Sequence, residues 1–288
     1  MREHHKPTTN PFLKWAGGKR KQVSYLARKL PAGDRLVEPF VGAGALFMGT
    51  DYESYLLADS NKDLINLYHT IKYYGPGFIS HAAALFSPSE NNRERYYYHR
   101  DRFNRITEPT ERAALFLYLN RHGYNGLCRY NLKGEFNVPF GAYKQPYYPM
   151  NELISFYRKT REKDVTFACQ DYQTTFNQVR DGDVIYCDPP YIKLSNTADF
   201  TAYTGRPFAM TEHITLHALC VQEAADGRPV VLNNHSHPVL NKKYRLSKAS
   251  LAFKRRGRSI NSNTGKRKGV VEVTASWNFW QAERRAAA

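Results

Sequence analysis

The chain has 288 residues, enough for one large α/β domain or for a catalytic domain that carries a smaller inserted one, but not for two unrelated domains of ordinary size. Hydrophobic residues make up 42% and aromatic residues 14% of the sequence, which excludes intrinsic disorder as the expectation. The formal net charge of +16 indicates a polyanionic partner, with nucleic acid favoured over a merely solvated basic surface.

The first part of the chain predicts the strand and helix order of a nucleotide-binding half. Residues 35–40 read as a buried strand, and the glycine turn at 41–44 leads into a short helix at 45–50. A second strand at 55–59 ends in a carboxylate, and Asn61 begins a helix that continues to Tyr73. This succession of strand, glycine turn, helix, strand and acid is typical of Rossmann-like folds.

The middle of the chain interrupts that alternation. Residues 77–122 show helical apolar spacing and contain no parallel-strand signal. Residues 123–148 are rich in Gly, Asn, Arg and Tyr, which suits a loop and a β-hairpin that present polar side chains. We therefore expect residues 75–148 to form an inserted, mostly helical target-recognition domain.

Strand signals return after this insert, at residues 165–169, 184–187 and 229–232, with a helix near 211–225 between the last two. The expected fold is α/β, with one Rossmann-like sheet built from residues 1–74 and 149–288 and interrupted by the recognition insert.

Four residues directly after the strand at 184–187 carry most of the chemistry: Asp188, Pro189, Pro190 and Tyr191. An exocyclic amine on a base is a poor nucleophile, and two acceptors that take its hydrogens would localise its lone pair. Asp188 and the Pro189 carbonyl can supply those acceptors, while neither proline nitrogen can donate. The Tyr191 ring can stack on a flipped base. A strand that ends in an ordinary proline turn would read the same way, so this motif alone leaves both interpretations open.

The glycine turn adds a cofactor hypothesis. Gly42 and Gly44 let the backbone approach a ligand beside a helix N-terminus, and Asp59 lies near the spacing at which an acid binds ribose hydroxyls. A full G-x-G-x-x-G is missing, which favours a cofactor without a pyrophosphate. Residues 12–19 contain Trp15 and a Gly-Lys pair, but they lack Walker spacing and a hydroxyl after Lys19, so a phosphate loop is disfavoured and Trp15 could equally be core.

Together these residues resemble the Dam-type DNA adenine-N6 methyltransferases, which act on duplex GATC. The likeness runs from residue 12 to 203 and weakens after that. Its most specific parts are residues 117–131 (LYLNRHGYNGLCRYN) and 134–141 (GEFNVPFG), with the DPPY motif at 188–191. The resemblance implies a class I methyltransferase sheet, S-adenosylmethionine as the methyl donor, double-stranded DNA as the partner and adenine N6 as the target.

The resemblance also implies roles for individual residues. Asp188 to Tyr191 would be catalytic, with Asp171 and Tyr172 toward the adenine ring of the cofactor. The cofactor would be surrounded by Trp15, Lys19, Phe40, Asp59, Asp171, Tyr172 and Asp188. Tyr124 would wedge into the duplex and Asn125 would take part in base flipping. Bases would be read by Lys14, Leu127, Arg129, Pro139 and Tyr143, and phosphates held by Arg100 and Ser195.

Two places depart from the family pattern. Asn234-His235 is followed by Ser236 where an acid is common, so His235 is expected to be a core histidine without a catalytic role. The basic runs at 254–258 and 266–268 flank a polar segment and suit a mobile loop, which either contacts phosphates or is simply solvated.

The remaining features concern the cysteines, the location of the protein and the functions that compete with the one above. The cysteines are scattered without zinc spacing, which predicts reduced thiols: Cys128, Cys169, Cys187 and Cys220. No apolar run is long enough to span a membrane, residues 1–10 are polar, and we expect a monomeric cytoplasmic protein of a bacterium or a phage-infected cell. A cytosine-N4 enzyme, a non-catalytic DNA-binding protein and an RNA methyltransferase remain as rivals, and the groove-reading insert argues against the first and the last.

Overall fold

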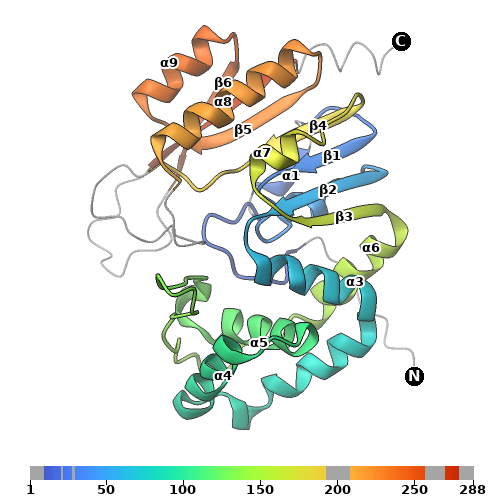
Figure 1. Ribbon diagram of the computed structural model, residues 1–288, viewed down its shortest axis with the longest axis vertical. Coiled ribbons are helices and arrows are strands. Elements are labelled where there is room, and N and C mark those ends of the chain that lie inside the picture. Colours follow the sequence, from blue (N-terminus) through green and yellow to red (C-terminus); the bar gives the residue numbers. More distant parts are fainter. Residues whose placement is uncertain (1–9, 21, 28–29, 193–207, 257–269, 279–288) are drawn as a thin grey trace.

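The computed structural model describes residues 10–20, 22–27, 30–192, 208–256 and 270–278, and its centre is a seven-stranded sheet (Figure 1). The strand order is β3-β2-β1-β4-β5-β7-β6. The first five strands in this order pair in parallel, whereas β7 runs antiparallel to both β5 and β6. The strands are β1 (Arg35–Glu38), β2 (Ser54–Asp59), β3 (Asp164–Cys169), β4 (Asp183–Cys187), β5 (Val230–His235), β6 (Ser250–Arg256) and β7 (Val270–Trp277).

The central strands are buried on both faces because their side chains alternate between two hydrophobic clusters. Leu36 belongs to one cluster and its neighbour Val37 to the other, and Leu57 and Leu56 divide in the same way on β2. Such strands read as nearly continuous apolar runs, which is why the sequence revealed them. The Rossmann-like sheet expected from the sequence is confirmed.

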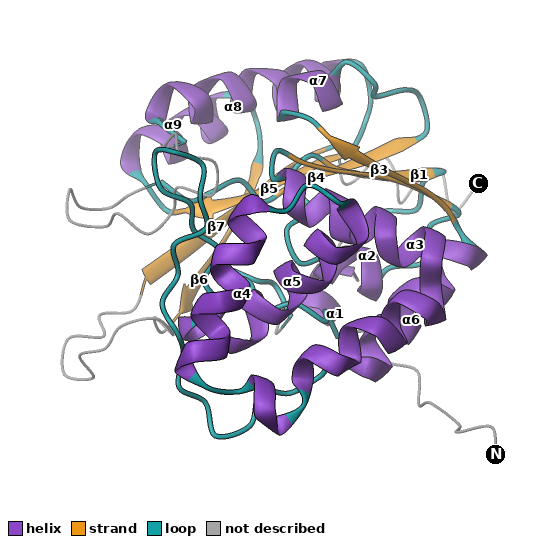
Figure 2. Cartoon of the chain, turned by 60° about the horizontal axis from the view of Figure 1, so that its bottom comes forward, coloured by secondary structure: helices purple, strands orange, loops and turns teal. Residues whose placement is uncertain are grey.

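Helices cover both faces of this sheet, as Figure 2 shows. On one side lie α1 (Val23–Ala27), α2 (Ala45–Gly49), α3 (Lys62–Ala83) and α6 (Met150–Glu162). On the other side lie α7 (Tyr172–Phe176), α8 (Met210–Ala225) and α9 (Pro238–Leu246). Because β1 and β4 are neighbours whose crossovers lead to opposite sides, their carboxyl ends border the crevice where ligands bind in such sheets.

Between β2 and β3, the described regular elements are all helical. The helix expected to end at Tyr73 continues to Ala83 but kinks at Gly75, which has φ +47°, directly before Pro76. Then follow η1 (Ala84–Phe86), η2 (Pro88–Glu90), α4 (Arg93–Arg105), α5 (Pro109–His122) and η3 (Tyr124–Gly126). The expected hairpin is reduced to two isolated antiparallel bridges, Gly123 with Phe140 and Tyr130 with Phe136.

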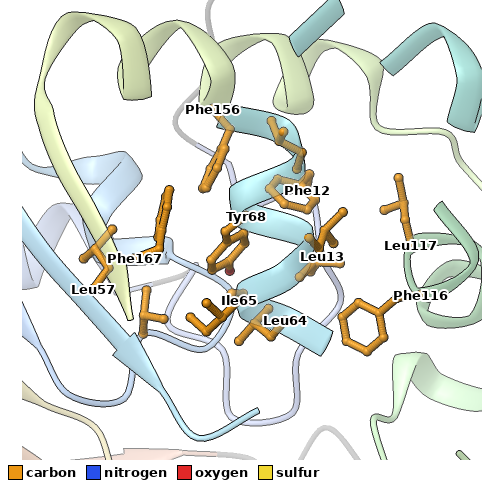
Figure 3. Close-up of a cluster of buried hydrophobic side chains, with 14 of the residues drawn as sticks. Phe12, Leu13, Leu57, Leu64, Ile65, Tyr68, Phe116, Leu117, Phe156 and Phe167 are labelled. Carbon is orange, nitrogen blue, oxygen red and sulfur yellow. The ribbon is translucent and has the colours of Figure 1, made fainter. Parts of the chain in front are cut away.

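The helical part shares a core with the sheet. Every residue of α5 from Ala113 to His122 is buried, because α5 packs between α3 and α4. Figure 3 shows Phe116 and Leu117 of α5 close to Leu64 and to Leu13, within the cluster that also contains Leu57 of β2. The insert is therefore fixed to the sheet by continuous apolar packing rather than by a linker.

One sequence expectation fails at the C-terminal edge of the sheet. Residues 254–256 belong to the edge strand β6, where Lys254 faces Glu272 of β7 in register, and do not begin a loop. Positive charges on an edge strand discourage pairing with another chain, which accounts for basic residues within a strand. The rest of the predicted loop, residues 257–269, lies outside the described residues. Among the described helices, none is long and apolar enough to cross a membrane.

Candidate active site

A cavity of about 710 Å³ opens at the carboxyl ends of β1, β2 and β4, within the size range of small-molecule sites. It brings together residues that the sequence analysis had assigned to one site from distant segments. The lining includes Trp15, Lys19, Phe40, Gly42, Asp59, Asp171, Tyr172, Asp188, Pro189, Pro190 and Tyr191. Gly44 is the one expected cofactor residue outside the lining; it has φ +66° and forms the N-cap of α2.

The glycine turn after β1 is shaped around Trp15. Gly42 has φ +47°, and a Cβ atom at this position would lie 3.0 Å from Trp15 Nε1. A side chain would therefore be strained by the backbone and crowded by the indole ring. Trp15 is half-buried: it packs against the hydrophobic core and also lines the cavity.

Asp59 joins this turn to the end of β2. Its Oδ2 accepts from the backbone N–H of Gly42 at 3.1 Å, and its Oδ1 accepts from that of Asn61 at 2.9 Å. Burial raises the pKa of Asp59 to about 6, against the opposing effect of these hydrogen bonds. The group is thus mainly ionised at neutral pH, and with about four lone-pair sites the carboxylate keeps capacity to accept from a ligand hydroxyl.

Aromatic rings form the opposite wall. Phe40 and Tyr172 stack with centroids 5.6 Å apart, and Phe208 meets both rings edge-on. The Tyr172 hydroxyl donates to Glu212 Oε2 at 2.7 Å, which fixes the ring. Asp171 is exposed, and its Oδ1 caps α7 by accepting from the backbone N–H of Thr174. Phe208 and Glu212 line the cavity but carried no motif that could have revealed them.

The DPPY motif lines the cavity, and its Asp188 forms a largely buried ion pair with Lys19. Lys19 Nζ lies 2.7 Å from Asp188 Oδ1, and it donates to the Tyr191 hydroxyl at 2.5 Å. The same ammonium lies 4.5 Å from the centroid of the Tyr191 ring. Lys19 therefore holds the carboxylate and the ring of the motif in a fixed relation, a role that the sequence analysis did not foresee.

Glu38 is a second carboxyl group in the cavity that the sequence analysis missed. It is the last residue of β1 and only 2% exposed. Burial and the nearby charge of Asp188 raise its pKa to about 8, so it is mostly protonated at neutral pH. A neutral Glu38 adds no second negative charge beside Asp188.

The expectation that His235 is a core residue is wrong. His235 is half-buried and lines the cavity, because it is the last residue of β5 and lies at the same edge of the sheet as Asp188, which directly follows β4. Its Nδ1 lies 3.1 Å from the Ile192 carbonyl oxygen, and its ring meets Tyr191 edge-on with centroids 4.5 Å apart. His235 thus packs against the aromatic ring of the DPPY motif.

A second group of expected residues gathers on the insert beside the first loop of the chain. Lys14 Nζ lies 3.9 Å from the centroid of the Tyr143 ring, and the Tyr143 hydroxyl accepts from the backbone N–H of Asn125 at 2.8 Å. The backbone N–H of Tyr124 donates to the Pro139 carbonyl at 2.9 Å. Tyr124 is 43% exposed, and Asn125 has φ +52°, so the tip of this loop is held in an uncommon conformation.

The remaining residues expected to bind DNA differ in their accessibility. Arg129 is half-buried and its guanidinium donates to the side-chain and main-chain oxygens of Asn137, at 2.8 and 3.1 Å. Leu127 is only 8% exposed and packs in the core, so little of its side chain is presented to a partner. Arg100 donates to the Val138 carbonyl and lies over the Tyr97 ring. Ser195 lies outside the described residues.

The chain is similar to known proteins along most of its length. A family model described as D12 class N6 adenine-specific DNA methyltransferase matches residues 15–257. A DNA adenine methylase of Serratia marcescens is 49% identical over 92% of this chain and 97% of its own length. DNA adenine methylases of Escherichia coli K12 and Vibrio cholerae El Tor are 46% and 44% identical, each over 92% of this chain and 94% of their own length.

Proposed function

The chain belongs to the D12 class N6 adenine-specific DNA methyltransferases, as a Dam-type adenine DNA methyltransferase, and from that premise we propose that it transfers methyl from S-adenosylmethionine to N6 of a flipped adenine in duplex GATC sites. The observation that carries this proposal is the cavity in which the DPPY motif and the glycine turn meet. The methyl donor and the methyl acceptor must meet in one site. The cavity is lined both by the residues proposed to bind the donor and by those proposed to bind the target adenine.

The cavity fits a nucleoside cofactor that carries no phosphate. Asp59 can accept from ribose hydroxyls, and the pair of stacked rings Phe40 and Tyr172 offers an apolar wall for a purine. The lining contains carboxyl groups, aromatic rings and glycines, with Lys19 as its one cation among the described residues, and this cation is already paired. When bound, the cofactor would supply an electrophilic methyl group on its sulfonium.

Asp188 and the Pro189 carbonyl would activate the amine. Each can accept one N6 hydrogen, which draws the nitrogen toward tetrahedral geometry and aims its lone pair at the methyl group. Methylation of N6 releases one N6 proton, which Asp188 would accept. Tyr191, held between Lys19 and His235, would stack on the flipped adenine.

We propose that residues 75–148 act as the target-recognition domain and that residues 1–74 and 149–288 form the catalytic domain. The kink at Gly75 supports the first boundary, and the start of α6 at Met150 supports the second. Within this domain the exposed Tyr124 suits a wedge into the base stack and Asn125 a partner in flipping. Bases would be read by Lys14, Arg129, Pro139 and Tyr143, with a smaller part for Leu127. Phosphates would be held by Arg100 and Ser195.

The substitution Asp188→Ala tests this assignment. Methyl transfer to a GATC duplex should fall by at least about a thousandfold, in line with the loss of a principal transition-state contact, while duplex affinity should stay within about threefold. Asp181→Ala is a matched control, because Asp181 is an exposed acid just before β4, at the end of the strand opposite to Asp188. Substantial turnover by the Asp188 variant would sink the mechanism, and lost duplex binding would show a folding defect.

A further inference from the structure

A buried set of contacts ties the loop that carries Leu127 and Arg129 to the start of α3. Leu127 has extended backbone angles, and the side chains that follow it take their partners on different parts of the protein. Arg129 points toward Asn137, whereas Cys128 and Tyr130 point back into the protein. The residues proposed to read bases thus alternate with residues that anchor the loop.

Both anchors contact the first turn of α3. Asn61 Nδ2 donates to Cys128 Sγ at 3.4 Å, and the Tyr130 hydroxyl donates to Asp63 Oδ2 at 2.6 Å. Asp63 is 2% exposed and also holds Arg112 of α5, with Nε to Oδ1 at 2.6 Å and Nη2 to Oδ2 at 3.1 Å. The single carboxylate of Asp63 therefore fixes α3, the insert helix α5 and the loop in one arrangement.

The same turn of α3 reaches the cavity. Asn61 donates its backbone N–H to Asp59 Oδ1, and its side-chain oxygen caps α3 by accepting from the backbone of Asp63 and Leu64. Two short paths then lead from Asp59 to the loop: through the Asn61 side chain to Cys128, and through the first turn of α3 to Asp63 and Tyr130. Asp59 is thus joined to the partners of both anchors by hydrogen bonds and by one turn of helix.

We propose that Cys128 and Tyr130 are positioning residues that couple the cofactor side of the cavity to base reading by the loop. This inference rests on the proposed function, since it takes Asp59 as a cofactor contact and Arg129 as a base contact. Neither anchor touches DNA; each acts by fixing the backbone from which Leu127 and Arg129 project. Burial raises the pKa of the Cys128 thiol to about 12, so this anchor is neutral and its contact does not depend on ordinary pH.

Tyr130→Phe is the sharpest variant, because it removes one hydroxyl and leaves the Asp63–Arg112 pair intact. Tyr52→Phe is its control: Tyr52 is a buried residue just before β2, and its hydroxyl donates to the carbonyl of Pro31 before β1, at the end of these strands opposite to the cavity. The readout is the ratio of kcat/KM on a GATC duplex to kcat/KM on duplexes with one base pair changed. Tyr130→Phe should lower this ratio by about tenfold, as expected for a lost hydrogen bond to a charged group, and Tyr52→Phe should not lower it.

A second variant tests the coupling and does not depend on Tyr130→Phe folding well. Cys128→Ala removes the acceptor of Asn61, and Cys220→Ala is its control as a buried cysteine on the other face of the sheet. Duplex Kd is measured with and without S-adenosylhomocysteine as the probe. The probe should tighten duplex binding by about fivefold or more in the unmodified protein, within the usual range of coupling between sites, and clearly less in Cys128→Ala.

The outcomes separate this inference from the function on which it rests. If the unmodified protein did not prefer GATC, the proposed specificity would fail. If it did prefer GATC but Tyr130→Phe matched Tyr52→Phe in discrimination, the anchors would be purely structural and this inference would fall. Equal effects of the probe on Cys128→Ala and Cys220→Ala, or no effect of the probe on the unmodified protein, would overturn the coupling.

Discussion

The ammonium group of Lys19 lies 2.7 Å from Oδ1 of Asp188, and the two side chains are only 5% and 17% exposed. This pair joins the loop before α1 to the end of β4. It orients the carboxylate of the DPPY motif before any substrate arrives, so an incoming amine would meet an acceptor that is already fixed. It also makes the stability of the protein depend on both partners.

Removing one partner should be worse than removing both. Lys19→Met leaves Asp188 as a poorly solvated, unpaired carboxylate and should lower the free energy of unfolding by about 3 kcal/mol, the low end for breaking a buried pair, since Asp188 is partly exposed. Lys19→Met combined with Asp188→Asn should recover at least about 1 kcal/mol of that loss. Urea unfolding of the unmodified protein, Lys19→Met, Asp188→Asn and the double variant measures this cycle. Simple additivity of the two substitutions would mean that the pair contributes nothing to stability.

Cofactor binding should weaken in acid because of Asp59. Burial raises the pKa of this group to about 6, so it gains a proton and loses acceptor capacity as the pH falls through that value. The KM for S-adenosylmethionine should therefore rise about tenfold between pH 7 and pH 5, since one unit below the pKa about nine-tenths of the group is protonated. Asp59→Asn should abolish this dependence, whereas Asp51→Asn, an exposed control, should keep it. A KM for Asp59→Asn that equalled the unmodified value at pH 7 would remove Asp59 from the site.

Glu38 should make the fold less stable as the pH rises. The unfolded chain loses this proton near the ordinary pKa of 4.5, whereas burial and Asp188 raise the folded pKa to about 8. Between these values the folded state binds more protons than the unfolded state, so its stability falls with increasing pH. Glu38→Gln does not titrate, and its Tm relative to the unmodified protein should rise by several degrees from pH 5 to pH 8. A constant difference in Tm would show that Glu38 is already ionised at pH 5 in the folded protein.

The sequence predicted the core of this molecule better than its periphery. Strands β1, β2 and β4 were visible because both of their faces are buried and their central residues are apolar. Strands β6 and β7 escaped because one or both faces are solvated and Lys254 and Arg255 resemble a charged loop. The length of α3 was underestimated because Gly75 and Pro76 read as a helix end, whereas the chain kinks there and continues.

The site divides in the same way. Asp188, Asp59 and Gly42 stand at strand ends in recognisable patterns, and they do line one cavity. Pairings between distant segments were invisible, since nothing in the spacing links Lys19 to a carboxylate 169 positions further along. Phe208 belongs to no motif, and His235 was expected in the core because Ser236 follows it where the family commonly has an acid, although its position at the strand end exposes it to the cavity.

Arg129 provides the test of base specificity. Its guanidinium is oriented by Asn137, which leaves the arginine ready to meet guanine O6 and N7 at the final C·G pair of GATC. Arg129→Ala should lower kcat/KM on GATC by roughly 10- to 100-fold, the equivalent of about 1–3 kcal/mol, and much less on sites altered at that pair. Lys133→Ala, an exposed basic residue in the same segment, is the control. Equal losses on every near-cognate site would assign Arg129 to the phosphate backbone.

The position of the transferred methyl group tests the central claim most directly. The purified protein is incubated with S-adenosylmethionine and one of two fully paired duplexes, which differ only in whether the site reads GATC or GTTC. The nucleosides of each duplex are then separated and identified by mass spectrometry. The account predicts N6-methyladenine in the GATC duplex, at one per strand of the site, and almost none in the other. Methyl groups on cytosine N4, or equal methylation of adenines in both duplexes, would contradict it.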